Sequence, residues 1–141
     1  MTKIQNIKAR EILDSRGNPT VECDIILNDN SFGRAAVPSG ASTGRHEAIE
    51  LRDSEKNRYG GKGVKNAISN IIKVVSPKLL NKNFESIKDF DQMILSIDGT
   101  PNKSTLGANA TLSLSLAFAK ALANHNKQEL FIFLNNNNDA I

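Results

Sequence analysis

The alternation of apolar and polar residues between Thr20 and Leu27 most strongly limits the fold of this chain. Four apolar side chains recur at every second position of this segment: Val21, Cys23, Ile25 and Leu27. Polar residues stand between them at Thr20, Glu22 and Asp24. A period of two is typical of a strand with one buried face. We therefore predict a half-buried strand from Thr20 to Leu27.

Turn-forming residues border this strand on both sides. Residues 14–19 read Asp-Ser-Arg-Gly-Asn-Pro and follow an extended candidate from Ile4 to Leu13. Residues 28–30 read Asn-Asp-Asn and precede a third candidate from Ser31 to Val37. These short connections predict a three-stranded antiparallel meander.

The remainder of the chain is predicted to be helical, which makes the fold class α+β. Apolar residues repeat at helical spacing at Val64, Ile68, Ile71, Ile72 and Val75, and Pro77 is expected to end or kink that helix. Ser86 and Asp89 resemble a capping box for a helix that displays Ile87, Phe90, Ile94 and Ile97 and stops at residues 98–101. The Ala-rich and Leu-rich segment 106–123 is expected to be the most buried helix. Together these helices form a bundle after the sheet.

Three shorter segments complete the predicted secondary structure. We expect a short helix from His46 to Asp53, a turn from Tyr59 to Gly63 and a short apolar turn from Leu130 to Leu134. The four asparagines at 135–138 have no packing pattern, so the tail is expected to fray.

Length and composition indicate one soluble domain. The chain has 141 residues, of which 39% are hydrophobic and 23% charged, and no apolar run approaches membrane-spanning length. The N-terminal residues lack a secretory signal pattern, and the single cysteine excludes an internal disulfide. We therefore expect a cytoplasmic protein with no membrane span, in which Cys23 is a packed core thiol rather than a reactive one.

The charge pattern favours a solvated mixed-charge surface over a nucleic-acid site. The net charge is +3, but the basic residues are scattered and nearly balanced by acidic ones. Aromatic residues make up 5% of the chain, so few are present to stack on bases. No nucleic-acid partner is expected.

The loop Ser39-Gly40-Ala41-Ser42-Thr43-Gly44 is the strongest functional candidate. Its glycines permit unusual backbone angles, and its three hydroxyls can bind a hard metal ion or an anion. We interpret it as a lid over a charged substrate. It does not fit the nucleotide-binding pattern, and His46-Glu47 lacks the second histidine of a zinc helix. The residue types alone predict no particular reaction.

Several motifs, found in order along the chain, resemble enolase. They are residues 14–22 (DSRGNPTVE), 37–44 (VPSGASTG) with 46–48 (HEA), 61–64 (GKGV), 96–100 (SIDGT), 102–104 (NKS) and 106–110 (LGANA). The resemblance runs from about Ile4 to Leu134.

The resemblance implies the N-terminal capping domain of a glycolytic carbon–oxygen lyase, phosphopyruvate hydratase. This family converts 2-phosphoglycerate reversibly to phosphoenolpyruvate with Mg²⁺ and acts as a homodimer. It further implies that residues 1–134 form the capping domain, and that 135–141 are a low-complexity tail or the start of a linker to a barrel domain. Because the family's catalytic residues lie on that barrel, no catalytic residue is expected in this chain. The chain alone is then expected to be inactive; the alternative is a truncated, non-catalytic interaction module.

The resemblance also assigns roles to individual residues. Ser42 matches the serine that binds the second magnesium ion when the loop closes. Arg10 and Glu22 match positions that form ion pairs across the dimer interface, although each can also be an ordinary exposed charge on a strand. Arg16 and Asn18 match the turn beneath the active site.

Overall fold

The computed structural model describes residues 2–38 and 48–137 and contains a three-stranded sheet followed by helices. The strands are β1 (Ile4–Leu13), β2 (Pro19–Leu27) and β3 (Phe32–Ala36), in the order β1-β2-β3 with both pairs antiparallel. The predicted α+β class and the predicted meander are confirmed.

The turn between β1 and β2 is organised by one side chain. The Asp14 Oδ1 atom accepts hydrogen bonds from the backbone N–H groups of Arg16 and Asn18, each at 2.9 Å. Gly17 adopts a positive φ of 77°, which favours glycine. These contacts fix the connection that the turn-forming residues predicted.

The apolar side chains of the predicted core strand, β2, lie on one buried face of the sheet. Val21, Cys23 and Ile25 have no exposed surface, and the thiol of Cys23 is packed as expected. The opposite face differs from a simple polar surface, because Thr20 and Asp24 are also buried. Charged neighbours on that face cover Asp24, as described below.

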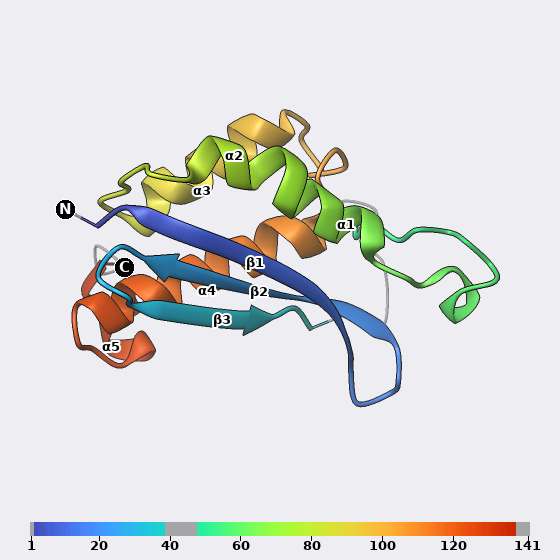
Figure 1. The fold of residues 1–141 in the computed structure, drawn as a ribbon, viewed down its shortest axis with the longest axis horizontal. Helices are drawn as coiled ribbons and strands as arrows, with labels where there is room; N and C mark the ends of the chain where they lie inside the picture. Colours follow the sequence, from blue (N-terminus) through green and yellow to red (C-terminus); the bar gives the residue numbers. More distant parts are fainter. Residues whose placement is uncertain (1, 39–47, 138–141) are drawn as a thin grey trace.

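The described part of the chain contains five α-helices, and three of them pack against the sheet. The five helices are α1 (Lys65–Ser69), α2 (Ser76–Leu79), α3 (Ile87–Asp98), α4 (Ala108–His125) and α5 (Leu130–Asn137). A short 3₁₀ turn occupies Tyr59–Gly61, within the predicted turn. Helix α4 lies against β2 and β3, whereas α1 and α2 lie along β1 (Figure 1).

Pro77 was predicted to end or kink a helix, and the structure shows that the helix does not end there. A π-helical segment, Asn70–Val75, joins α1 to α2, and the helical chain continues past Pro77 to Leu79. The buried apolar residues of this run stand four apart, at Ala67, Ile71, Val75 and Leu79. Since π turns hold more residues than α turns, this spacing keeps all four on one side. Ile72, predicted for the same face, is 45% exposed.

Two further local predictions are corrected. The predicted helix 46–53 is absent over the described residues 48–53, which run as an irregular segment. Their backbone groups bond to α4 and to a neighbouring loop instead of to each other, as detailed below. The predicted apolar turn 130–134 is the beginning of helix α5, which continues to Asn137.

Helices α3 and α4 agree with their predictions. The Asp89 N–H group donates to the Ser86 Oγ atom at 3.1 Å, and Gly99 ends α3 with a φ of 74°. Helix α4 buries more residues than any other helix in residues 48–137. The rings of Phe90 and Phe118 stack at 4.2 Å between centroids, which joins the two helices in the core.

Candidate functional site

The candidate loop leaves the sheet beside the turn between β1 and β2. Because the strands are antiparallel, β1 ends, β2 begins and β3 ends at the same side of the sheet. The predicted loop Ser39–Gly44 follows directly after β3. Residues 39–47, including Ser42, lie outside the described part of the structure, so their predicted roles are judged from the segments that hold the loop.

Val37 anchors the start of the loop. Its N–H group donates to the Val21 carbonyl at 3.0 Å, and its own carbonyl accepts from the Thr20 hydroxyl at 2.6 Å. Val37 and Thr20 are both buried. Two hydrogen bonds in a buried setting therefore fix where the loop leaves the sheet.

Asn109, in the first turn of α4, anchors the chain after the loop. Its Oδ1 atom accepts from the Leu51 N–H group at 3.1 Å, and its Nδ2 group donates to the Leu51 carbonyl at 3.0 Å. Ile49 adds two backbone hydrogen bonds, one to Asn102 at 2.9 Å and one from Ala108 at 2.7 Å. These partners explain why residues 48–53 do not form a helix.

Gly107 permits this close approach. A Cβ atom at Gly107 would lie 2.5 Å from the Leu51 Cβ atom, and the residue also has a φ of 96°. A larger residue would therefore push the returning segment away from α4.

Arg52 connects the same segment to the start of β2. Its Nη1 group donates to the carbonyls of Pro19 and, at 2.8 Å, Lys62, while Nη2 lies 3.1 Å from the Glu50 carboxylate. The returning segment is thus tied to the sheet as well as to α4.

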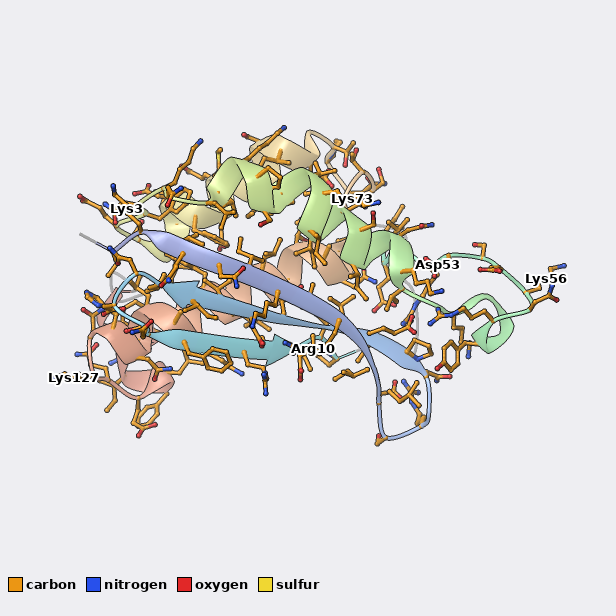
Figure 2. All side chains as sticks on the ribbon, in the orientation of Figure 1. Lys3, Arg10, Asp53, Lys56, Lys73 and Lys127 are labelled. Atoms are coloured by element: carbon orange, nitrogen blue, oxygen red, sulfur yellow. The ribbon has the colours of Figure 1, made fainter. Side chains whose placement is uncertain are left out.

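Asp53 caps helix α1, which begins at Lys65. Its two carboxylate oxygens accept from the N–H groups of Lys65 and Asn66, each at 2.9 Å, and it lies beside the beginning of α1 (Figure 2). Glu11 on β1 accepts from the Val64 N–H group at 3.0 Å and pairs with Arg58. The hydrogen bond from Arg58, with that from Val64, outweighs burial and lowers the pKa of Glu11. The sequence did not single out these caps.

A second charged group occupies the face of the sheet that α4 does not cover. Arg10 forms ion pairs with Glu22, its register partner, and with Asp24, while Arg34 on β3 pairs with Asp24. Burial opposes ionisation of Asp24, but hydrogen bonds and charge from Arg34 and Arg10 outweigh it and lower the pKa of this carboxyl group. We call Arg10, Glu22, Asp24 and Arg34 the open-face cluster.

A protein-family model provides the decisive comparison. The model described as "Enolase, N-terminal domain" matches residues 4–134. This chain belongs to the enolase N-terminal domain family. In this enolase domain the three-stranded meander is followed by helices, and residues 39–44 come after the third strand.

The described residues of this enolase domain contain no cluster of metal-ligating side chains. Outside residues 39–47 and the termini, no group of three or more His, Cys, Asp or Glu side chains is placed to bind a metal. Three carboxylates on the segments that flank the loop have partners. Asp14 accepts from the N–H group of Arg16, Glu50 pairs with Arg52, and Asp53 caps α1.

The predicted interface residues of the enolase domain lie together. Arg10 and Glu22 are bonded to each other within the chain, and Arg10 is labelled in Figure 2. Sequence reasoning placed Glu22 and Asp24 on one face but missed Arg34, whose register opposite Asp24 was the available signal. No helix of the described residues is long and apolar enough to cross a membrane.

Proposed function

We propose that this chain serves as the N-terminal capping domain of an enolase, phosphopyruvate hydratase. The complete enzyme removes water from 2-phosphoglycerate to form phosphoenolpyruvate, reversibly, in cytoplasmic glycolysis. The family match over residues 4–134 carries this proposal. Residues 1–134 then act as the cap, and 135–141 are a low-complexity tail or the start of a linker.

The anchors support a lid role for residues 39–44. Buried hydrogen bonds at Val37 hold one end, and Asn109 holds the segment after the loop at Leu51. A loop that contains two glycines between fixed ends can close over a substrate while its attachment points stay in place. Closure excludes water from the reacting carbon atoms.

Ser42 is the proposed magnesium ligand of this chain. In enolases magnesium stabilises the negative charge that develops on the substrate carboxylate when the neighbouring proton is removed. A serine offers hydroxyl and carbonyl oxygens, which are ligands that magnesium accepts. The chain's contribution is thus to bring Ser42 to the substrate when the loop closes.

The remaining catalytic groups are proposed to come from a barrel domain outside this chain. Three described carboxylates support this division, since Asp14 organises its turn, Glu50 pairs with Arg52 and Asp53 caps α1. We accordingly expect the 141-residue chain alone to be inactive.

Homodimer formation in the complete enzyme is proposed to use the open-face cluster. The side chains of Arg10 and Arg34 are 34% and 53% exposed, so their outer N–H groups remain available to a partner's carboxylates. Glu22, at 19% exposure, can accept from a partner cation at the same place.

Ser42→Ala in an active enzyme that carries this domain tests the lid proposal. Activity should fall most when magnesium is limiting and recover in part at high magnesium, while the unfolding midpoint stays unchanged. Glu85→Gln, an exposed change outside the loop, is the control and should leave the magnesium dependence unaltered. An unchanged magnesium dependence in Ser42→Ala would remove the ligand assignment.

The second candidate is a non-catalytic interaction module. The two functions separate in a fusion of this domain to an enolase barrel: a capping domain supports turnover there, whereas an interaction module does not.

A further inference from the structure

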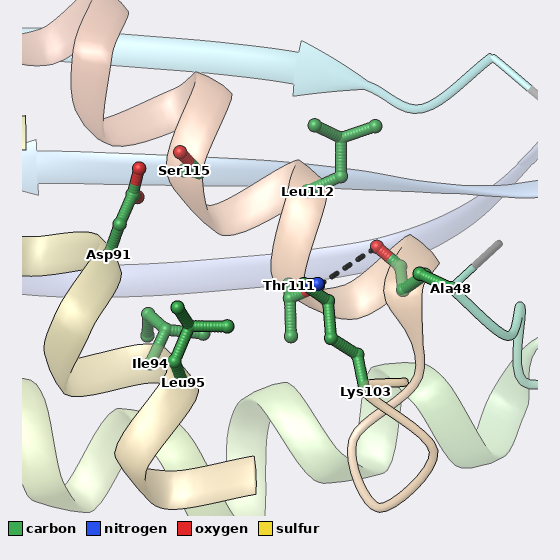
Figure 3. Close-up of a pocket in the computed structure, with 9 residues that line it drawn as sticks. Ala48, Asp91, Ile94, Leu95, Lys103, Thr111, Leu112 and Ser115 are labelled. Atoms are coloured by element: carbon green, nitrogen blue, oxygen red, sulfur yellow. Dashed lines mark hydrogen bonds between the residues drawn. The ribbon is translucent and has the colours of Figure 1, made fainter. Parts of the chain in front are cut away.

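A pocket between α3 and α4 combines apolar walls with one unsatisfied acid. Its volume is about 320 Å³, in the lower range for small-molecule sites. The apolar wall includes Ile94 and Leu95 of α3 and Leu112 of α4, with Ala48 at one side (Figure 3). Leu95 and Leu112 are 45% and 42% exposed, which leaves an apolar surface open to a ligand.

Asp91 supplies the polar group of this pocket. Its Oδ1 atom is buried and has no hydrogen-bond partner, the only such side-chain atom found among the described residues. Burial raises the pKa of Asp91, and a hydrogen bond with Ser115 opposes this shift. A buried carboxylate oxygen without a donor is energetically costly, so this atom favours a ligand that brings one.

Lys103 does not supply that donor. Figure 3 shows Asp91 beside Ser115 and Lys103 directed toward Ala48, so the two charged residues lie at different parts of the pocket. The positive charge of Lys103 acts on Asp98, whose pKa it helps to lower. The Asp91 Oδ1 atom therefore remains without a hydrogen-bond donor.

We propose that this pocket binds a small organic ammonium ion, with its apolar body against Leu95 and Leu112 and its N–H groups directed at Asp91. Charge complementarity selects this ligand class, because an ammonium donates to the unpaired oxygen while its hydrocarbon part covers the exposed leucines. The inference goes beyond the proposed capping function and does not depend on it.

Benzylamine is a suitable probe, and benzyl alcohol is its uncharged counterpart of similar shape. In two-dimensional ¹H–¹⁵N NMR of the full 141-residue chain, benzylamine should cause saturable shifts at amides near Asp91 and Ser115. Benzyl alcohol should bind about ten-fold more weakly, the difference expected for loss of one charge-assisted hydrogen bond.

Asp91→Asn should weaken benzylamine binding by about ten-fold and leave benzyl alcohol binding unchanged. Asp89→Asn, an exposed change on the same helix, should alter neither. Equal binding of amine and alcohol, no saturation, or shifts away from α3 and α4 would overturn the proposal. If the shifts at these amides depend on protein concentration and not on amine concentration, the pocket binds a second copy of the chain. That result would also overturn the proposal.

Discussion

Arg34 holds Asp24 through two hydrogen bonds across the open face of the sheet. The Arg34 Nε group lies 2.8 Å from Oδ1 of Asp24 and Nη2 lies 3.1 Å from Oδ2, while the Asp24 side chain is 3% exposed. The two residues are direct register partners on β2 and β3. Together with Arg10, this pair allows a carboxylate to be buried within a three-stranded sheet.

Asp24→Asn should destabilise the domain near neutral pH by about 2 kcal/mol, because two arginines lose a buried anionic partner. Urea unfolding followed by circular dichroism measures this difference. Glu85→Gln, an exposed change on the described surface, is the control and should cost less than about 0.5 kcal/mol. Equal stability of Asp24→Asn and the unchanged protein would show that the cluster does not stabilise the fold.

The same carboxylate should make stability depend on acidity. Since folding lowers the pKa of Asp24, its stabilising effect is complete above its unfolded pKa of about 3.9 and is lost as pH falls through the lower folded pKa. The stability gap between the unchanged protein and Asp24→Asn should therefore shrink in acid. A gap that stays constant across this range would contradict the assignment.

Asp91→Asn should show the opposite sign. Burial raises the pKa of Asp91, so ionisation at neutral pH opposes folding, and the neutral amide should increase the free energy of unfolding. The variant should gain least in acid, where Asp91 is already protonated. Destabilisation at neutral pH would contradict the view that the Asp91 Oδ1 atom lacks a partner.

Cys23 should be unreactive in the folded protein. Burial, with a contribution from Asp24, raises the pKa of this thiol to about 12. A disulfide-exchange reagent should label it rapidly in denaturant and only at the rate of unfolding in native buffer. Rapid native labelling would show that the strand opens locally at Cys23.

Gly33, the only glycine in strands β1, β2 and β3, should not tolerate a side chain. A Cβ atom there would lie 2.0 Å from the Ala117 carbonyl oxygen of α4, so Gly33→Ala should cost about 3 kcal/mol or more, or prevent folding. Gly99→Ala is the control, since it adds backbone strain of about 1 kcal/mol without a severe clash. Thermal unfolding compares the two, and similar melting temperatures would show that α4 can move away from β3.

Local patterns predicted the sheet and the best-defined helices. Alternation at Val21, Cys23 and Ile25 identified β2, and the Ser86 cap with Gly99 delimited α3, because these signals act over a few residues. The failures depended on distant partners. Residues 48–53 bond to Asn109 and Asn102, and the π-helical turns rotate Ile72 toward solvent, neither of which a local period reveals.

The candidate site, too, was only partly predictable from the sequence. The residue types pointed to the loop and the family resemblance to Ser42, but the groups that hold the loop, Thr20 and Asn109, are far apart in sequence and have ordinary local patterns. Arg34 was missed because its relation to Asp24 exists only once β2 and β3 are paired.

The most direct test replaces the N-terminal domain of an active enolase with residues 4–134 of this chain. Ultraviolet absorbance follows phosphoenolpyruvate formed from 2-phosphoglycerate and magnesium, and circular dichroism confirms folding. The account predicts turnover by the fusion, loss of that turnover at limiting magnesium in Ser42→Ala, and none by the 141-residue chain alone. A folded fusion without activity, or clear phosphoenolpyruvate formation by the separate chain, would contradict it.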